Sequence, residues 1–270
     1  MLIAQITDTH IREAGELCYD KVDTAPFLER AVAKLNALSP RPDLVVATGD
    51  LVDMATEGEY RRLKSLLAPL EIPLYLVVGN HDHRDHLRAV FPEHKYLPGG
   101  KFIHYTVEHL TVRLIVLDTN IPRQGAGELC AERLAWLDAR LAEQPKRPTA
   151  IVMHHPPFRT GIVKMDELGL SGIEGFERVV SKYDCVQSIL CGHLHRAIQA
   201  RVGGTMAQTC PSTAHQMYFG IGEGSIWGFA FEPPAIQLHW WNDRSLVTHT
   251  VLIERFDGPY SFRGGVPIPI

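Results

Sequence analysis

The strongest constraint on the fold of this chain is a series of six short apolar runs, each followed directly by polar residues. The runs occupy residues 2–6, 44–47, 74–78, 114–117, 150–153 and 188–191. They are apolar at every position rather than at alternate positions, which is typical of β-strands that are covered on both faces. Segments with helical spacing lie between them, at residues 26–38, 57–67, 84–91, 128–143 and 175–183. This alternation predicts a layered α/β fold with mainly parallel central strands.

The pattern changes after about residue 200. Apolar runs at residues 226–231, 236–241 and 246–253 are separated by short connections, which favours antiparallel pairing. We expect the C-terminal antiparallel strands, within about residues 201–255, to complete a second sheet or to form a small cap or oligomerisation layer. They would belong to a single domain that spans residues 1–270.

Composition and charge exclude several classes of partner. The net charge is −4 and no block of lysine or arginine stands out, so a nucleic-acid partner is not expected. No apolar run approaches the roughly 18 residues that cross a bilayer, and no basic segment precedes the first run, so we expect neither a membrane span nor a signal peptide. Five cysteines without a CxxC pair predict reduced thiols in the cytoplasm rather than disulfides or a thiolate zinc site.

Five of the six runs end beside side chains that can bind a metal ion. These side chains are Asp8, His10, Asp50, Asn80, His154, His193 and His195. Because the carboxyl ends of parallel strands meet at one edge of a sheet, we expect them to converge. They offer more donors than one ion can use, which indicates two metal ions, and the absence of thiolates from the set favours zinc, manganese or iron. If Asp50 bridges the ions, they lie roughly 3.5–4 Å apart, as in two-metal hydrolases.

The order of these motifs resembles that of the calcineurin-like metallophosphoesterases. The motifs are Asp8-x-His10, Gly49-Asp50, Gly79-Asn80-His81-Asp82, His154 and Gly192-His193-x-His195. The resemblance implies a four-layer α/β/β/α sandwich with two central mixed sheets. It also implies one metal ion held by Asp8, His10, Asp50 and His195, and a second held by Asp50, Asn80, His154 and His193. His81 would contact the phosphate and assist the leaving oxygen, and Asp82 would orient His81.

Within that family, the chain is most similar to the branch of class III cyclic-nucleotide phosphodiesterases and glycerophosphodiesterases. The resemblance implies a phosphodiesterase that hydrolyses small phosphodiesters, either glycerophosphodiesters or 3′,5′-cyclic nucleotides, by attack of a metal-bound hydroxide. Asn80, His81 and His215 would contact the substrate, His215 because residues 211–216 resemble a substrate-side loop of this branch. The two metals would be iron, manganese or zinc, with cobalt as a substitute in vitro, and the enzyme would form a homo-oligomer.

Three alternatives stay open at this point: a phosphomonoesterase, a nuclease of the same fold, and a non-catalytic metal-binding scaffold. The natural diester, the metals bound in the cell and the oligomeric state are also open. Several other polar residues have a structural interpretation. His155 precedes two prolines and is expected in a turn, His83 and His86 on a solvated helix face, and Asp53 in a local hydrogen bond. Asp118 ends a strand and is equally compatible with a structural role or a place beside the metal ligands.

Overall fold

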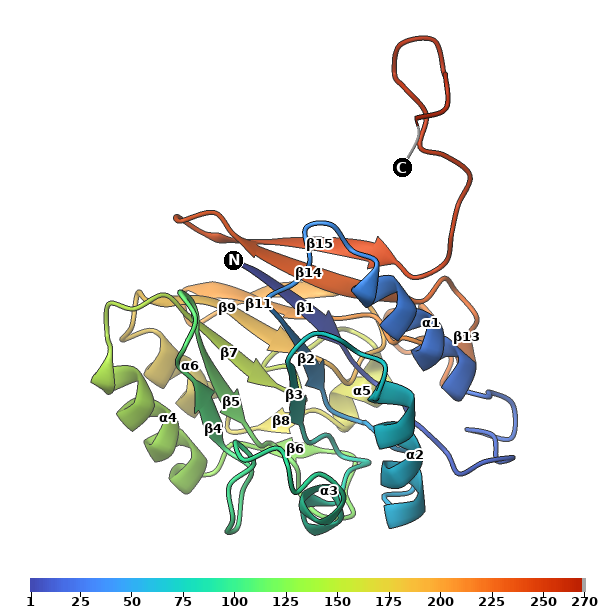
Figure 1. The fold of residues 1–270 in the computed structure, drawn as a ribbon. Helices are drawn as coiled ribbons and strands as arrows, with labels where there is room; N and C mark the ends of the chain where they lie inside the picture. The colour runs from blue at the N-terminus through green and yellow to red at the C-terminus, as the bar shows by residue number, and fades with distance from the viewer. Residues whose placement is uncertain (269–270) are drawn as a thin grey trace.

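Two β-sheets lie face to face at the centre of the computed structural model, which describes residues 1–268 (Figure 1). The first sheet has the strand order β15-β14-β1-β2-β3. Its strands are β1 (Leu2–Ile6), β2 (Leu44–Thr48), β3 (Leu74–Val77), β14 (Ala235–Trp241) and β15 (Leu246–Leu252). The strands β1, β2 and β3 run parallel, whereas β14 is antiparallel to both β1 and β15. The C-terminal hairpin therefore extends the first sheet at the edge beyond β1.

The second sheet is also mixed, with the strand order β10-β11-β9-β7-β5-β4. Its strands are β4 (Tyr105–Val107), β5 (Arg113–Leu117), β7 (Thr149–Met153), β9 (Val186–Cys191), β10 (Gln199–Val202) and β11 (Thr205–Thr209). The strands β5, β7, β9 and β11 are parallel, and β4 and β10 pair antiparallel at the two edges.

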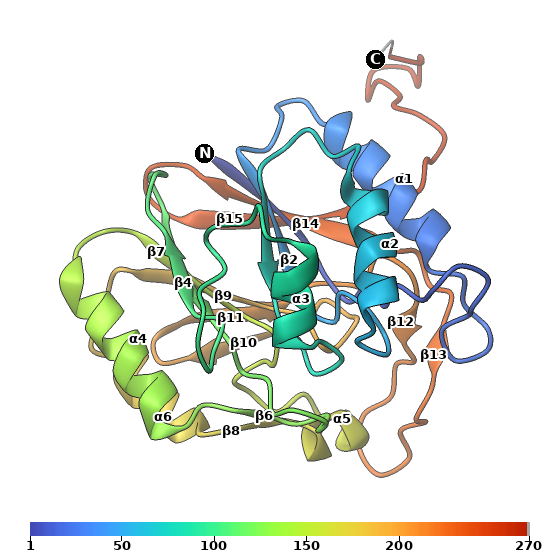
Figure 2. The ribbon, with the colours of Figure 1, turned by 60° about the horizontal axis from the view of Figure 1, so that its bottom comes forward.

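Helices cover the outer face of each sheet (Figures 1 and 2). The first sheet is covered by α1 (Ala25–Asn36), α2 (Glu57–Leu67) and α3 (Arg84–Val90), and the second by α4 (Ala131–Glu143) and α6 (Ile173–Val180). The short elements are α5 (Val163–Glu167), β6 (Gly127–Glu128), β8 (Leu170–Ser171), β12 (Gln216–Met217) and β13 (Phe229–Ala230). The order helix, sheet, sheet, helix confirms the predicted four-layer α/β/β/α sandwich.

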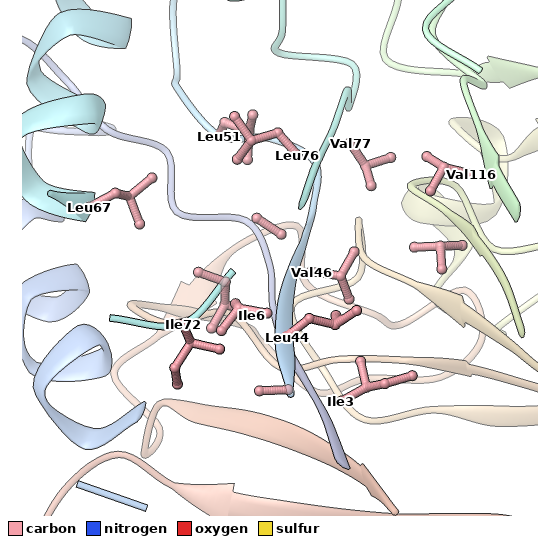
Figure 3. Close-up of a cluster of buried hydrophobic side chains, with 14 of the residues drawn as sticks. Ile3, Ile6, Leu44, Val46, Leu51, Leu67, Ile72, Leu76, Val77 and Val116 are labelled. Atoms are coloured by element: carbon pink, nitrogen blue, oxygen red, sulfur yellow. The ribbon is translucent and has the colours of Figure 1, made fainter. Parts of the chain in front are cut away.

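Apolar side chains fill the space between the layers. Val46 and Val77 point from the first sheet toward Val116 of the second, whereas Leu67 and Ile72 lie on the helix side of the first sheet (Figure 3). The three valines are fully buried, and each such side chain stabilises the fold by about 1.5–3 kcal/mol. Burial on both faces explains why the sequence of these strands is apolar at every position.

The six predicted strands and five predicted helices all form, with boundaries that differ by a few residues. The capping box before α2 is present, because the Thr56 hydroxyl accepts a hydrogen bond from Glu59 N while Glu59 accepts one from Thr56 N. The strand predicted at residues 226–231 is wrong except for Phe229–Ala230. Ile226 and Trp227 are 61% and 56% exposed in a glycine-rich loop, so their apolar character does not indicate a buried strand.

The C-terminal segment beyond β15 leaves the sandwich and runs away from both sheets (Figure 1). Residues 269 and 270 of the predicted domain lie outside the described range. Within that range, no helix is both long and apolar enough to cross a membrane.

Candidate metal centre

The predicted metal ligands come together where the carboxyl ends of the two sheets meet. Asp8, Asp50 and Asn80 follow β1, β2 and β3 of the first sheet. His154 follows β7 of the second sheet, and the pair at 193 and 195 follows β9. All of them except Asn80 are buried. The structure thus assembles one polar cluster from residues that are up to 187 positions apart, counting from 8 to 195.

The backbone at five of these residues has the left-handed conformation, which non-glycine residues rarely adopt. Their φ angles are 51° at Asp8, 41° at His10, 47° at Asp50, 72° at His193 and 49° at His195. Such a conformation costs on the order of 1–3 kcal/mol at each residue, and it persists only where the surrounding fold imposes it. Backbone hydrogen bonds from Asp8 N to Gly49 O and from His10 N to Asp50 O, both 3.0 Å, help to hold it. Clustered strain of this kind is typical of functional sites.

Two glycines of the motifs allow the loops to approach one another. A Cβ atom on Gly79 would lie 2.2 Å from Asp50 Oδ1, and one on Gly192 would lie 2.2 Å from Thr7 Oγ1 and 2.8 Å from Thr48 O. Both distances are far below van der Waals contact, so any side chain at either position would push the loops apart. Because these two positions carry no side chain, the loops that hold the proposed ligands can lie close together.

One group of donors lies between β1 and the loop after β9. His195 Nε2 is 3.4 Å from Asp8 Oδ1 and 3.2 Å from His10 Nε2, and His10 Nε2 is 3.8 Å from Asp50 Oδ2. Asp8, His10 and His195 each offer an atom to a common point. With Asp50 they are the four residues predicted for the first ion.

The second group lies on the other side of Asp50. His154 Nε2 is 3.3 Å from Asp50 Oδ2 and 3.0 Å from Asn80 Oδ1, and the same Asn80 oxygen is 3.0 Å from His193 Nδ1. These are the four residues predicted for the second ion. Asp50 borders both groups, as the prediction of a shared carboxylate requires.

The protonation pattern of the histidines supports a cation in each group. His10 Nδ1 donates to Asp53 Oδ1 at 3.2 Å and His195 Nδ1 donates to His215 O at 3.0 Å, so in the neutral imidazoles both Nε2 atoms carry lone pairs. The two Nε2 atoms lie 3.2 Å apart. Likewise, His154 Nδ1 donates to Thr48 O, so its Nε2 faces oxygens of Asp50 and Asn80. Burial would lower the pKa of both His195 and His154, but Asp8 raises it at His195 and Asp50 raises it to about 9 at His154, so a proton on Nε2 takes the place that a bound cation would fill.

The charge of Asp50 suits such a site. Burial alone would raise the pKa of this carboxyl group, but the imidazoles of His154, His81 and His10 hold its pKa well below the usual value. The Asp50 carboxylate is therefore ionised at neutral pH, and its Oδ1 also accepts a hydrogen bond from His81 N at 2.8 Å.

His81 stands beside the two groups with its ring partly exposed. His81 Nδ1 donates to the backbone oxygen of Asp53 at 2.8 Å and lies 3.5 Å from Asp53 Oδ1. This bond fixes the ring and leaves Nε2 free to meet a ligand in the cleft, which His81 lines. Burial would lower the pKa of His81, but the carboxylates of Asp50, Asp53 and Asp82 raise it above the usual value.

The residue that orients His81 is Asp53, which corrects the prediction that Asp82 does so. Asp82 is buried and turned away from the His81 ring, accepting hydrogen bonds from Gly79 N at 2.8 Å, Leu51 N at 3.2 Å and Tyr60 Oη at 2.8 Å. Sequence adjacency was misleading because the chain turns between residues 79 and 82. Burial raises the pKa of Asp82 to about 7.

Asp53 does more than the local hydrogen bond predicted for it. Its Oδ1 accepts from His10 Nδ1, its Oδ2 accepts from Arg12 at 3.1 Å, and its backbone oxygen holds His81. The signal in the sequence is a second carboxylate three residues after Asp50. After the left-handed turn at Asp50, this spacing brings the Asp53 side chain beside His10.

His215, predicted to contact substrate, lines the cleft and is 1% exposed. Its backbone oxygen fixes His195, and its ring packs edge-on against Tyr19 and Phe229. Burial lowers the pKa of His215 to about 2, and its Nδ1 has no hydrogen-bond partner among the described residues. The His215 imidazole that lines the cleft is therefore neutral and has one nitrogen unpaired among the described residues.

The remaining polar candidates take structural positions. His155 is buried, with its Nδ1 bonded to Thr119 Oγ1 and its Nε2 to Gly125 O. Asp118 accepts hydrogen bonds from Arg84 and from Ile103 N rather than from a proposed ligand. The rings of His83 and His86 lie 4.2 Å apart and tilted at the start of α3, where His83 is exposed and lines the cleft and His86 is half-buried against Ala55 O.

The matches of this chain to a family model, to other sequences and to a solved structure agree with one another. The family model described as calcineurin-like phosphoesterase matches residues 1–197, which include all the predicted ligands. A probable glycerophosphodiester phosphodiesterase of Arcobacter nitrofigilis is 36% identical over 264 residues, 97% of each chain. A probable cyclic nucleotide phosphodiesterase of Rhodopseudomonas palustris is 35% identical over 238 residues, 87% of this chain and 86% of that protein. The solved structure of a dimetal phosphatase from Danio rerio has a TM-score of 0.73 at 15% identity, covering 94% of this chain and 96% of its own.

Proposed function

Because this chain belongs to the calcineurin-like phosphoesterase family, we propose that it hydrolyses small phosphodiesters at a centre of two metal ions. The observation that carries this proposal is the pair of ligand groups that share Asp50, with the His81 ring beside them. The two similar proteins named above are called phosphodiesterases, which favours a diester over a monoester as substrate. Retention of the full ligand set disfavours a non-catalytic scaffold.

The proposed ligands are those predicted from the sequence. Asp8, His10, Asp50 and His195 would hold one ion, and Asp50, Asn80, His154 and His193 the other. When bound, the two cations supply a nucleophile from water at neutral pH and neutralise charge on the phosphate. The chain itself fixes the ligands, because the other nitrogen of His10, His154 and His195 donates to an oxygen of the protein.

Three residues of the chain would act on the substrate directly. His81 points Nε2 into the cleft and would donate a proton to the leaving oxygen, with Asp53 fixing the ring. Asn80 and His215 line the same cleft and would contact the phosphate. Asp82 would act indirectly, by holding the turn that contains Asn80 and His81.

The proposal also covers the identity of the metals, the oligomeric state, the cellular compartment and the domain organisation. The oxygen and imidazole donors suit iron, manganese or zinc, with cobalt as a substitute in vitro. A homo-oligomer is supported by Trp240 and Leu252, which are 48% and 38% exposed on the edge hairpin. All five cysteines are free thiols, which suits the reducing cytoplasm. The described part of the chain acts as one domain in this proposal, since both sheets contribute ligands.

A kinetic panel tests the function. After reconstitution with manganese or zinc, the enzyme should hydrolyse bis(p-nitrophenyl) phosphate faster than p-nitrophenyl phosphate or single-stranded DNA, and a chelator should abolish this activity. His81→Ala should lower kcat by about 10²-fold or more while both metals stay bound. Activity restricted to the monoester or to DNA, or an unchanged kcat in His81→Ala, would contradict the proposal.

A further inference from the structure

The cleft over the metal centre divides into two branches of different chemistry. Asn80, His81 and Gly125 line both branches, so the reacting phosphate would lie where the branches meet. One branch has a volume of about 370 Å³ and the other of about 910 Å³. A phosphodiester carries two substituents, and each branch can take one of them.

Apolar side chains form the wall of the smaller branch, which we call the apolar branch. They are Tyr19, Met165, Leu168, Met217, Trp227 and Phe229. Asp50, at the metal end, is the one carboxylate among the described residues lining this branch, which has no lysine or arginine in that lining. A charged substituent would lose its hydration here without gaining a partner, so the wall favours an uncharged group.

The aromatic part of this wall is packed in place before any ligand arrives. The rings of Tyr19 and Phe229 lie 5.5 Å apart with an interplanar angle of 30°, and His215 meets Tyr19 edge-on at 5.4 Å. Behind them, Phe229 packs against a buried cluster that includes Cys18 and Val22. Flat rings held in this way offer a surface on which a flat or apolar group gains contact with little ordering of the protein.

Trp227 lines the apolar branch from a loop that is held by hydrogen bonds at its base and near its middle. The loop joins β12 to β13, and Tyr218 N donates to Gly228 O at 2.8 Å next to Trp227. Near the middle of the loop, Gly222 N donates to Gly161 O at 2.9 Å, which places the loop beside the start of α5 (Figure 2). The Trp227 side chain is 56% exposed, so it has apolar surface left for a ligand to cover.

The larger branch is polar. It is lined by Arg84, Asp85, Arg88, Lys101, Arg123 and Gln124, among others. Arg84 is bonded to Asp118 and Arg88 to Asp85, whereas Arg123 forms no ion pair within residues 1–268. This branch therefore suits a hydrated, hydrogen-bonding substituent rather than an apolar one.

We propose that the preferred substrate is an unsymmetrical phosphodiester, with a flat or apolar uncharged substituent in the apolar branch and a polar substituent in the larger branch. Trp227 and Tyr19 are the residues that determine specificity for the apolar substituent. This inference rests on the proposed phosphodiesterase function and names the class of diester that the same site takes.

Two diesters that differ only in one substituent test this inference, namely benzyl glyceryl phosphate and methyl glyceryl phosphate. Both share the polar glyceryl group, and benzyl alcohol and methanol are similar leaving groups. Phosphorus NMR measures the monoester products whichever bond breaks. The wild-type enzyme should prefer the benzyl ester by about tenfold in kcat/KM, the effect of one good aromatic contact. A carboxylate at the para position of the benzyl ring should remove this preference, because the apolar branch has no partner for it.

Trp227→Ala should lower kcat/KM for the benzyl ester by about tenfold and leave the methyl ester within about twofold, whereas Trp227→Phe should keep most of the preference. The matched control is Trp240→Ala, which removes an exposed tryptophan from β14 and should retain the wild-type ratio. Equal rates for the two esters in the wild type, or an unchanged ratio in Trp227→Ala, would overturn the inference while leaving the phosphodiesterase function intact. No hydrolysis of either ester by the metal-loaded enzyme would reject that function and the inference together.

Discussion

At the scale of single residues, Asp53 and Asp82 show how two neighbouring carboxylates take different roles. Asp53 contacts His10, Arg12 and, through its backbone oxygen, His81. Asp82 instead accepts hydrogen bonds from two backbone N–H groups and from Tyr60. One carboxylate therefore orients a proposed metal ligand, and the other holds the backbone of the turn.

We predict that Asp53→Asn and Asp82→Asn have separable effects. Asp53→Asn should lower kcat/KM by about 10–100-fold and weaken metal binding, because the amide has one acceptor oxygen for both His10 and Arg12 and carries no charge to strengthen the bond that orients His10. Asp82→Asn should lower the free energy of unfolding by about 1–3 kcal/mol, because its amide NH₂ faces a donor and leaves it unpaired. Steady-state kinetics, metal content and thermal unfolding, measured for both variants, test these separate effects. A loss of activity in Asp82→Asn at full metal content, without loss of stability, would restore the role first predicted for Asp82.

The sequence was sufficient to predict which residues gather at the strand ends, but not the contacts around them. Each ligand directly follows an apolar run, so its position at a strand end could be predicted without knowing the packing. The partner of His81 could not be predicted in this way, because it depends on the left-handed backbone at Asp50, where φ is 47°. That turn brings Asp53 back to the site, and no local preference of aspartate indicates it.

At the scale of elements, the C-terminal hairpin is linked to the first sheet through a buried histidine. His239 of β14 is 0% exposed. Its Nε2 donates to Gln5 Oε1 at 3.0 Å and its Nδ1 accepts from Thr248 Oγ1 at 2.8 Å. Gln5 in turn donates to Thr48 Oγ1 at 2.8 Å, so the hairpin, β1 and β2 share one polar network. Burial lowers the pKa of His239 to about 3.

This buried histidine predicts a specific dependence of stability on pH. The folded-state pKa of about 3 lies below the unfolded value of 6.5, so the unfolded state takes up the proton first as pH falls. The stability that neutral His239 contributes is therefore complete above about pH 6.5 and is lost as pH falls toward 3. Between pH 7 and pH 5, protonation of His239 in the unfolded state alone lowers the free energy of unfolding by about 2 kcal/mol.

Replacing His239 by glutamine should remove this effect of His239 protonation. Chemical unfolding of the chelator-treated protein at several pH values measures the difference, and the variant should lose about 2 kcal/mol less than the wild type between pH 7 and pH 5. His249→Gln, which changes an exposed histidine on β15 of the same hairpin, should keep the wild-type pH dependence. Equal slopes for the wild type and His239→Gln would show that His239 titrates normally in the folded state.

Strands that are buried on both faces were predictable from their continuous apolar sequences. The strands β1, β2, β5 and β7 are buried almost throughout, which gives them continuous apolar sequences. The hairpin of β10 and β11 escaped prediction because β10 has polar, exposed residues at two of its four positions and therefore no apolar run. The opposite error occurred at residues 226–231, where apolar side chains lie on a loop that borders the cleft.

At the scale of the whole molecule, the centre exists only because two sheets pack against each other. Their strand ends supply the two ligand groups, and Asp50 lies between the groups. The branched cleft depends on the same packing, since Tyr19 meets Phe229 across 210 positions of sequence, counting from 19 to 229. Such long-range contacts leave no periodic signal in the chain, which is why the apolar branch could not be predicted.

The central claim is that this packing creates a site for two cations that share Asp50. Anomalous X-ray scattering from crystals of the manganese- or zinc-loaded protein, recorded at the absorption edge of the metal, tests it most directly. We expect two peaks per chain, one on each side of Asp50, with one of them bordered by Asp8, His10 and His195 and the other by Asn80, His154 and His193. A single peak, or two peaks that do not both contact the Asp50 carboxylate, in crystals of a fully active enzyme would contradict it.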